Sequence, residues 1–252
     1  MALDEALLAR ARALGPAAGE VVVRVYGWAR PTLSFGRNQR AVGQYDPVGL
    51  AERGLDVVRR PTGGRAVLHW REVTYSVTAA VGVLAPAGAP LRVAYARINR
   101  LLVGALAALG VDAREARPAG RTPHPDGAPC FERPTAGEIV AEQEGTLRKL
   151  VGSAQWQDDG ALLQHGSILI DDDQSAVATL VRPPAPPPPP PATLRQLLGR
   201  APTLDEIAAA VLHAARVGED PCADLLQPDE ALREGAAARV GRYEGVAWTW
   251  RR

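Results

Sequence analysis

The sequence contains only two cysteines in 252 residues, at positions 130 and 222. Two cysteines do not make the disulfide framework of a small secreted protein, and no CxxC pair or histidine-rich cluster offers the ligand spacing of a zinc site. We therefore expect a protein of the reduced cytoplasm that binds no metal.

The chain also lacks a long apolar run and a strong charge of one sign. No stretch of about twenty apolar residues predicts a transmembrane helix. The first residues carry Asp4 and Glu5 where a secretory signal would be basic. The formal net charge of +1 creates no overall field that would attract a polynucleotide. We expect neither a membrane nor a nucleic-acid partner.

The motifs of several common enzyme classes are missing as well. The consecutive glycines at 63 and 64 lie between two strand-like runs, and no GxGxxG is present. A P-loop or a dinucleotide-binding turn would instead lead into a helix. No Ser-His-Asp order and no GxSxG elbow competes for the role of nucleophile. A cysteine is therefore the candidate nucleophile.

The apolar pattern that is present predicts one domain of the α/β or α+β class. A content of 46% hydrophobic residues can build one large core. Residues 66–70 and 73–80 are expected to pair as a hairpin across Arg71 and Glu72. Three further strands are expected to form a meander that brings Lys149 and His165 near strand or turn ends. Helical periodicity marks 2–14 and 91–109, and strand patterns mark 21–28, 32–35, 55–59, 138–142, 150–155, 161–171 and the final 245–252.

A proline tract divides the chain near its last quarter. Eight of the nine residues at 183–191 are proline, which excludes a helix or a central strand there. We expect an exposed polyproline II connector over 183–192, which follows a catalytic domain at 1–182. A short helical extension at 193–252 is expected to pack on the same domain, with Thr203 as the N-cap of one of its helices.

The candidate chemistry lies in residues 130–171. Cys130, Lys149 and His165 bring a thiol, an amine and an imidazole within about forty residues, a set that can serve acyl transfer. Each has a plainer interpretation. A lone cysteine is more often a small buried hydrophobe, Lys149 could belong to a solvated face, and His165 could cap a glycine turn.

A second candidate region surrounds Gly63 and Gly64. Arg59, Arg60 and Arg65 flank these glycines, and His69 ends the strand that follows. Backbone bared by glycine and flanked by guanidinium groups can cradle an anion or a narrow acyl chain. A solvated strand edge is the alternative.

Several ordered motifs together resemble the lipoate-protein ligase and octanoyltransferase family. They are RRPTGGRAVLH at 59–69, REVTYSV, CF at 130, GEIVAE, RKLVGSAQ and LLQHGSILID, joined by MALDEALL, LSFGRNQ and Trp248. The likeness covers nearly the whole chain. TGGR combined with a cysteine in CF is most similar to the octanoyltransferase branch that uses a thiol in this loop. The resemblance implies an α+β fold with mixed sheets packed against helices, like the catalytic domain of biotin protein ligases.

The resemblance also implies a reaction. Cys130 would take an octanoyl group from acyl carrier protein as a thioester. A lysine of a lipoyl domain, such as glycine cleavage H protein or a 2-oxoacid dehydrogenase E2, would then attack that thioester. Lys149 would bind the acyl carbonyl oxygen, and no cofactor would be needed. The implied pocket residues are Arg60, Thr62, Gly63, Gly64, His69, Gly152, Ser153, His165 and Gly166.

Three alternatives remain open at this point. A ligase would activate free lipoate with ATP and Mg²⁺. An amidotransferase would move an acyl group between lipoyl domains with the same cysteine. A non-catalytic member would bind an acyl chain while Cys130 stays inert. Exchange of one thioester for another is nearly isoenergetic and the final amide is downhill, so the transferase requires no ATP.

Overall fold

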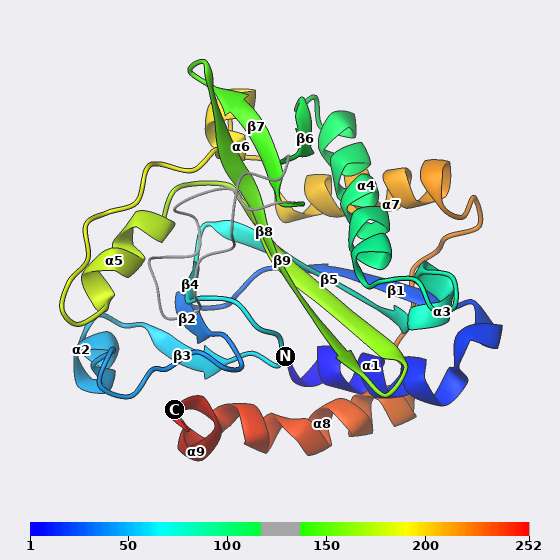
Figure 1. The fold of residues 1–252 in the computed structure, drawn as a ribbon, viewed down its shortest axis with the longest axis horizontal. Coiled ribbons are helices and arrows are strands. Elements are labelled where there is room, and N and C mark those ends of the chain that lie inside the picture. Colours follow the sequence, from blue (N-terminus) through cyan, green and yellow to red (C-terminus); the bar gives the residue numbers. More distant parts are fainter. Residues whose placement is uncertain (117–136, 252) are drawn as a thin grey trace.

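The computed structural model describes residues 1–116 and 137–251, so Cys130 lies outside the described residues. Two β-sheets pack against helices, and the α+β class predicted from the sequence is confirmed (Figure 1). No helix in the described part is long and apolar enough to span a membrane.

Among the described residues the larger sheet has six strands, and every pair of neighbouring strands is antiparallel. Its middle is the predicted meander, which is confirmed as β7, β8 and β9. Glu144 and Gly145 join β7 to β8 with positive φ angles of 53° and 72°, the geometry of a tight hairpin turn. In sheet order the strands are β1 (Val21–Tyr26), β5 (Glu72–Ala80), β9 (Ala161–Leu169), β8 (Thr146–Asp158), β7 (Ile139–Gln143) and β6 (Ala113–Glu115).

The smaller sheet has three strands. Its central strand β2 (Thr32–Phe35) runs parallel to β3 (Asp56–Arg59) and antiparallel to β4 (Val67–His69). The predicted hairpin between residues 66–70 and 73–80 is therefore wrong, because β4 and β5 belong to different sheets. All nine residues of β5 are buried, and β5 pairs with β1 and β9 instead of β4.

The segment between β4 and β5 is fixed by a third part of the chain. The carboxylate of Asp173 accepts hydrogen bonds from the backbone N–H of Arg71 at 2.8 Å and from its guanidinium at 2.6 Å. The carbonyl of Arg71 accepts a hydrogen bond from the N–H of Ile170. These contacts explain how the chain passes from one sheet to the other without a hairpin.

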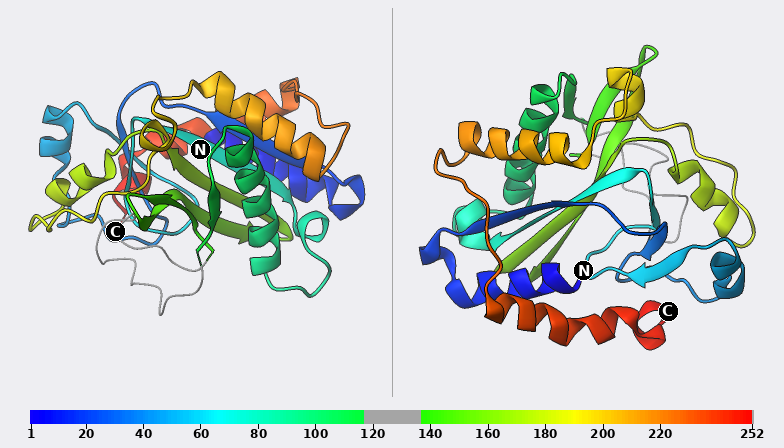
Figure 2. Two further views of the ribbon diagram at one scale, coloured as in Figure 1. Left: turned by 90° about the horizontal axis from the view of Figure 1, so that it is seen from above. Right: turned by 180° about the vertical axis from the view of Figure 1, so that it is seen from behind.

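Helices cover both faces of the six-stranded sheet (Figures 1 and 2). On one face α4 (Arg92–Ala108) contributes Ile98, Leu102 and Leu106 to the main core. On the other face Leu8 and Ala11 of α1 (Ala2–Leu14) pack against β9. Successive side chains of β9 point to opposite faces of the sheet, so Leu162 packs in the main core and Leu163 packs against α1. The sheet is therefore the central layer of the molecule.

The C-terminal helices continue these layers. α7 (Leu204–Gly218) packs on α4, and α8 (Glu230–Glu244) runs along α1, as Figure 1 shows. Thr203 caps α7 as predicted, in a complete capping box with Glu206. The remaining short elements are α2 (Pro47–Glu52), α3 (Val81–Leu84), α5 (Val177–Leu180), α6 (Leu194–Leu198) and 3₁₀ turns at Pro16–Ala18 and Gln174–Ala176.

Two predictions at the C-terminal side have different outcomes. Residues 183–191 contain no helix or strand and are mostly exposed, although Pro188 and Pro191 are buried. The predicted final strand is wrong, because α9 (Val246–Thr249) is a helical turn. This turn places Trp248 and Thr249 against Arg59. The Trp248 indole donates to the carbonyl of Arg59 at 2.8 Å, and Arg59 Nε donates to the carbonyl of Thr249 at 3.0 Å.

Candidate functional site

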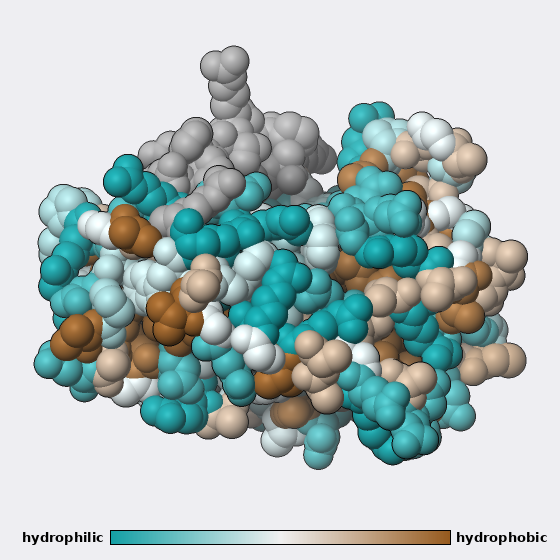
Figure 3. Space-filling view, turned by 90° about the horizontal axis from the view of Figure 1, so that it is seen from below, coloured by the Kyte–Doolittle hydropathy of each residue, from teal (hydrophilic) through white to brown (hydrophobic). Residues whose placement is uncertain are grey.

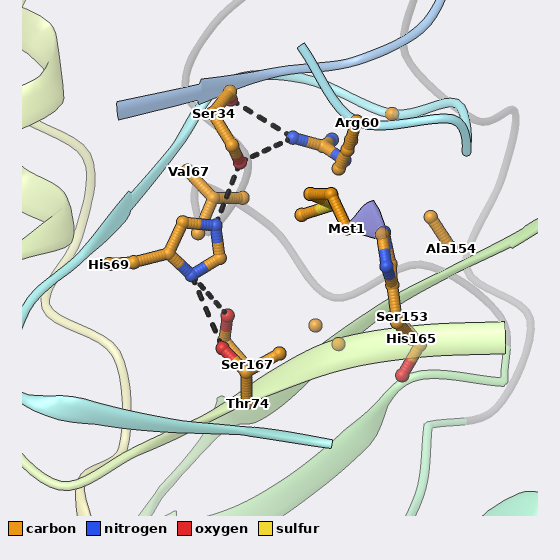
Figure 4. A pocket seen from close by; sticks show the side chains of 13 residues that line it. Met1, Ser34, Arg60, Val67, His69, Thr74, Ser153, Ala154, His165 and Ser167 are labelled. Carbon is orange, nitrogen blue, oxygen red and sulfur yellow. Dashed lines mark hydrogen bonds between the residues drawn. The ribbon is translucent and has the colours of Figure 1, made fainter. Parts of the chain in front are cut away.

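A cavity of about 40 Å³ lies between the two sheets (Figure 4). Its walls bring together β2, β4, β5, β8, β9 and the turn after β3. Seven of the nine predicted pocket residues line it: Arg60, Gly64, His69, Gly152, Ser153, His165 and Gly166. Met1, Ser34, Val67, Thr74, Ala154 and Ser167 complete the lining. What these residues bind stays a prediction, but the fold gathers them around one space.

The other two predicted pocket residues support the wall. Thr62 Oγ1 lies 2.5 Å from His165 Nε2, and the carbonyl of Gly63 accepts hydrogen bonds from the guanidinium of Arg60 at 2.9 and 3.1 Å. Gly36 was not among the predicted residues. A Cβ at Gly36 would come within 1.9 Å of the Gly64 carbonyl oxygen, so the LSFGRNQ motif provides the bare backbone against which the Gly63-Gly64 turn packs.

The arginines beside this turn are buried and hold backbone. Arg60 Nη1 donates to the carbonyl and the hydroxyl of Ser34, at 3.0 and 2.9 Å, and its Nη2 donates to the carbonyl of Arg65 at 2.6 Å. Arg59 Nη1 donates to the carbonyls of Gly36 and Gln39 at 2.6 and 2.7 Å. The solvated-edge interpretation is wrong, because 0% of Arg59 and 4% of Arg60 is exposed.

His69 stands in a chain of hydrogen bonds along the cavity wall. Ser34 Oγ lies 2.8 Å from His69 Nε2, and Glu72 Oε1 lies 3.0 Å from His69 Nδ1. Trp28 stacks on the imidazole with ring centroids 4.4 Å apart. Ser34 and Glu72 were missed at the sequence level, because they lie on β2 and β5 and meet His69 only after the sheets pack.

His165 lies in the interior of β9, opposite Ala154 and Ser76, so its prediction as a turn residue is wrong. Burial lowers the pKa of His165 to about 3, and the charge of Arg60 acts in the same direction while Asp4 opposes it. The imidazole is thus neutral at physiological pH. Its Nδ1 has no hydrogen-bond partner among the described residues.

Lys149 is also buried, with only 2% of the residue exposed, and it lies near the start of β8, close to the β7–β8 turn, as predicted. Its Nζ lies 2.5 Å from Glu138 Oε1, so the solvated-face interpretation is wrong. Lys149 is the only lysine among 29 lysine and arginine residues. The presence of a single lysine in the sequence could have indicated a site that needs a compact ammonium group. Its position relative to Cys130 stays a prediction, because Cys130 lies outside the described residues.

The described residues form no candidate metal site. Across residues 1–116 and 137–251, no group of three or more His, Cys, Asp or Glu side chains is arranged to hold a metal ion. Cys222 is an exposed free thiol.

Comparisons with known proteins assign this arrangement to a family. The family model described as the lipoyl protein ligase A/B catalytic domain matches residues 1–216. The octanoyltransferase LipM of Kyrpidia tusciae is 38% identical over 268 residues, which cover 100% of this chain and 94% of that protein. The octanoyltransferase LipM of Moorella thermoacetica is 42% identical over 172 residues, which cover 68% of this chain and 60% of that relative.

A solved structure shares the fold. It is that of a bi-partite lipoate protein ligase and its E2 lipoyl domain from Thermoplasma acidophilum, with a TM-score of 0.72 at 19% identity over 99% of this chain and 89% of that one. The resemblance seen in the sequence motifs is confirmed. This chain belongs to the lipoyl protein ligase A/B catalytic domain family.

Proposed function

We propose that this protein transfers an octanoyl group to a lysine of a lipoyl domain, as a step of lipoate biosynthesis. The observation that carries the proposal is the 38% identity to the octanoyltransferase of Kyrpidia tusciae along the whole of this chain. The cavity adds support, because the residues that line it are those the motifs of the family single out. The lipoyl-domain acceptor is supported by the solved ligase of the same fold, which is described with its E2 lipoyl domain.

The proposed chemistry uses Cys130 as the nucleophile. Its thiolate attacks the thioester carbonyl of octanoyl-acyl carrier protein, the carbon–sulfur bond to the carrier breaks, and the carrier leaves as a thiol after taking up a proton. The target lysine amine then attacks the enzyme thioester, forms the amide and releases the Cys130 thiol. No ATP is consumed. We place the reaction in the cytoplasm, where a thiol stays reduced.

Lys149 is proposed to stabilise the oxyanion of both steps. Its ammonium is compact and buried, and Glu138 Oε1 holds Nζ at 2.5 Å. Loss of one oxyanion donor costs about 10²- to 10³-fold in rate. Lys149→Met should therefore slow transfer by that factor, provided the variant still folds.

The acyl chain is proposed to enter the cavity between the sheets. A volume of about 40 Å³ holds only a few water molecules, at roughly 10–15 Å³ each. Side chains must move to admit eight carbons. Met1 projects between Arg60 and His165 in Figure 4, and an unbranched thioether is the kind of side chain that can change rotamer at low cost.

The test is direct. The full chain is incubated with octanoyl-acyl carrier protein without ATP, and its intact mass is measured. We expect a gain of one octanoyl group, located on Cys130 by peptide mass spectrometry, and its transfer to an apo lipoyl domain added afterwards. Cys130→Ala should lose both signals, and Cys222→Ala should retain both.

Several outcomes would contradict the proposal. Acylated lipoyl domain formed only from free octanoate, ATP and Mg²⁺ would identify a ligase. Full transfer by the Cys130→Ala variant would remove the thiol from the mechanism. The absence of any acylation, with the acyl chain still bound, would identify a non-catalytic member.

A further inference from the structure

The cavity wall holds a second set of groups suited to acyl transfer. Ser34, His69 and Glu72 form a linear series in which the hydroxyl lies 2.8 Å from His69 Nε2 and the carboxylate lies 3.0 Å from His69 Nδ1. Serine, histidine and carboxylate in this order are the parts of a nucleophile, its base and the group that orients the base. Such a set is recognised by geometry, and its order along the chain differs between folds.

The surroundings hold the histidine in the orientation that this role requires. Glu72 Oε1 also accepts a hydrogen bond from Thr74 Oγ1 at 2.7 Å, and Trp28 Nε1 donates to Thr74 Oγ1 at 2.8 Å. The Trp28 ring stacks on the imidazole. A carboxylate on Nδ1 favours the tautomer that carries its proton there, and this leaves Nε2 free to accept the proton of Ser34.

A cation stands where negative charge would develop. Arg60 Nη1 lies 2.9 Å from Ser34 Oγ, and Arg60, Ser34 and His69 all line the same cavity. The guanidinium charge lowers the cost of forming an alkoxide on Ser34. In Figure 4 the Ser34 hydroxyl, the imidazole and the guanidinium converge on one side of the cavity.

We propose that Ser34, His69 and Glu72 form a second nucleophilic site, which hydrolyses medium-chain acyl thioesters independently of Cys130. The substrate class rests on the proposed function, because both reactions use the same cavity. Ser34 Oγ attacks the thioester carbonyl and forms a carbon–oxygen bond while the carbon–sulfur bond breaks. His69 Nε2 takes the serine proton and delivers it to the leaving thiolate. Water, deprotonated by His69, then cleaves the ester to a carboxylic acid and restores Ser34.

The first experiment separates this site from the cysteine. The full-length Cys130→Ala variant is incubated with octanoyl-coenzyme A, and the released thiol is measured with a chromogenic reagent. We expect hydrolysis above the uncatalysed rate. Adding Ser34→Ala should lower it by about 10²-fold or more, and adding Glu72→Gln by about tenfold or more, because the carboxylate sets the tautomer of the base. Ser175→Ala, at a serine outside the cavity lining, should change nothing.

A second measurement does not depend on the stability of any variant. The unmodified chain is treated with a fluorophosphonate that carries an octyl group, which phosphonylates activated serines, and the labelled residue is identified by peptide mass spectrometry. Label on Ser34 supports the proposal. No label, label on another serine, or hydrolysis that persists in the folded Cys130→Ala, Ser34→Ala double variant overturns it. None of these results bears on octanoyl transfer by Cys130, which is measured separately.

Discussion

Burial sets the protonation of His165, a residue that faces the cavity. The side chain lies in a strand and is 4% exposed, and burial lowers its pKa to about 3 from an ordinary value of 6.5. A neutral imidazole can both donate and accept one hydrogen bond. At Nε2 it contacts Thr62, and its buried Nδ1 has no hydrogen-bond partner among the described residues. The free energy of unfolding should therefore depend on pH through the protonation of His165.

The first prediction concerns pH. Between pH 6.5 and about 3, His165 binds a proton in the unfolded chain but not in the folded one, so stability falls as the pH decreases through this window. The slope from this residue reaches at most about 1.4 kcal/mol per pH unit. Urea unfolding at pH 7, 6 and 5 measures it. His165→Gln should flatten the slope, whereas the exposed His213→Gln should not. An unchanged slope in His165→Gln would contradict the shift.

The buried arginine and lysine side chains make different kinds of contact. Arg59 and Arg60 use the planar fork of the guanidinium to bind several carbonyl oxygens at once. The single lysine is placed where one compact charge contacts one carboxylate. The motifs indicated that Arg60 and Lys149 matter, but they did not indicate that Arg59 holds backbone carbonyls from distant parts of the chain.

The contact between β8 and β9 is the element-scale feature on which the cavity floor depends. A Cβ at Gly166 would meet the Gly152 carbonyl oxygen at 2.2 Å and the ring of Tyr75 at 2.8 Å. Both glycines line the cavity. The two strands can approach here only because Gly166 carries no side chain.

The second prediction follows from that approach. Gly166→Ala should lower the free energy of unfolding by about 1–3 kcal/mol, because an added methyl group forces two backbones apart. It should also weaken acyl binding. Gly241→Ala is the matched control, since this exposed glycine lies in α8 and an added methyl group there would meet no atom within 4 Å. The control should stabilise the helix by up to about 1 kcal/mol. Equal effects of the two substitutions in chemical denaturation would be incompatible with the strand contact described.

Element types were predictable from local signals, and element partners were not. Thr203 caps its helix with the side-chain contacts that the sequence indicated, and Asp46 caps α2 with its side chain as well. The strands β4 and β5 are close in sequence, yet each pairs elsewhere. Hairpin propensity acts over a few residues, whereas burial of every position in β5 requires two flanking strands. Tertiary burial outweighed the local preference.

At the scale of the whole molecule, the last helices are tied to the rest of the chain. Leu232 of α8 packs against Ala6 and Leu7 of α1, and Glu5 accepts hydrogen bonds from Arg242 and Tyr243. On the face of the molecule seen from below in Figure 3, hydrophobic side chains are scattered among hydrophilic ones rather than gathered in one patch. The division at residues 182 and 193 that the proline tract suggested stays a prediction.

The third prediction tests how much α8 and α9 contribute to the rest of the molecule. A chain that stops at residue 228 loses α8 and α9, and with them the contacts of Trp248 and Thr249 to Arg59. It should unfold at a lower temperature than the full chain and should transfer octanoyl groups more slowly, because Arg59 holds the strand that leads into the Gly63-Gly64 turn. Trp248→Phe should lie between the two chains in thermal unfolding. A truncated chain with full stability and activity would show that α8 and α9 do not support the rest of the fold.

The sequence by itself determined the family, the fold class, most helices and strands, and the motifs from which the cavity is built. These depend on periodicity, capping residues and glycine or proline positions, which act over a few neighbouring residues. Only the tertiary structure decided which strands pair, that Lys149 is buried, that His165 is neutral, and that Ser34 meets His69 and Glu72. The contact between Thr62 and His165 spans 103 positions. Charge states and hydrogen-bond partners depend on such distant neighbours and on the exclusion of water, which no local pattern records.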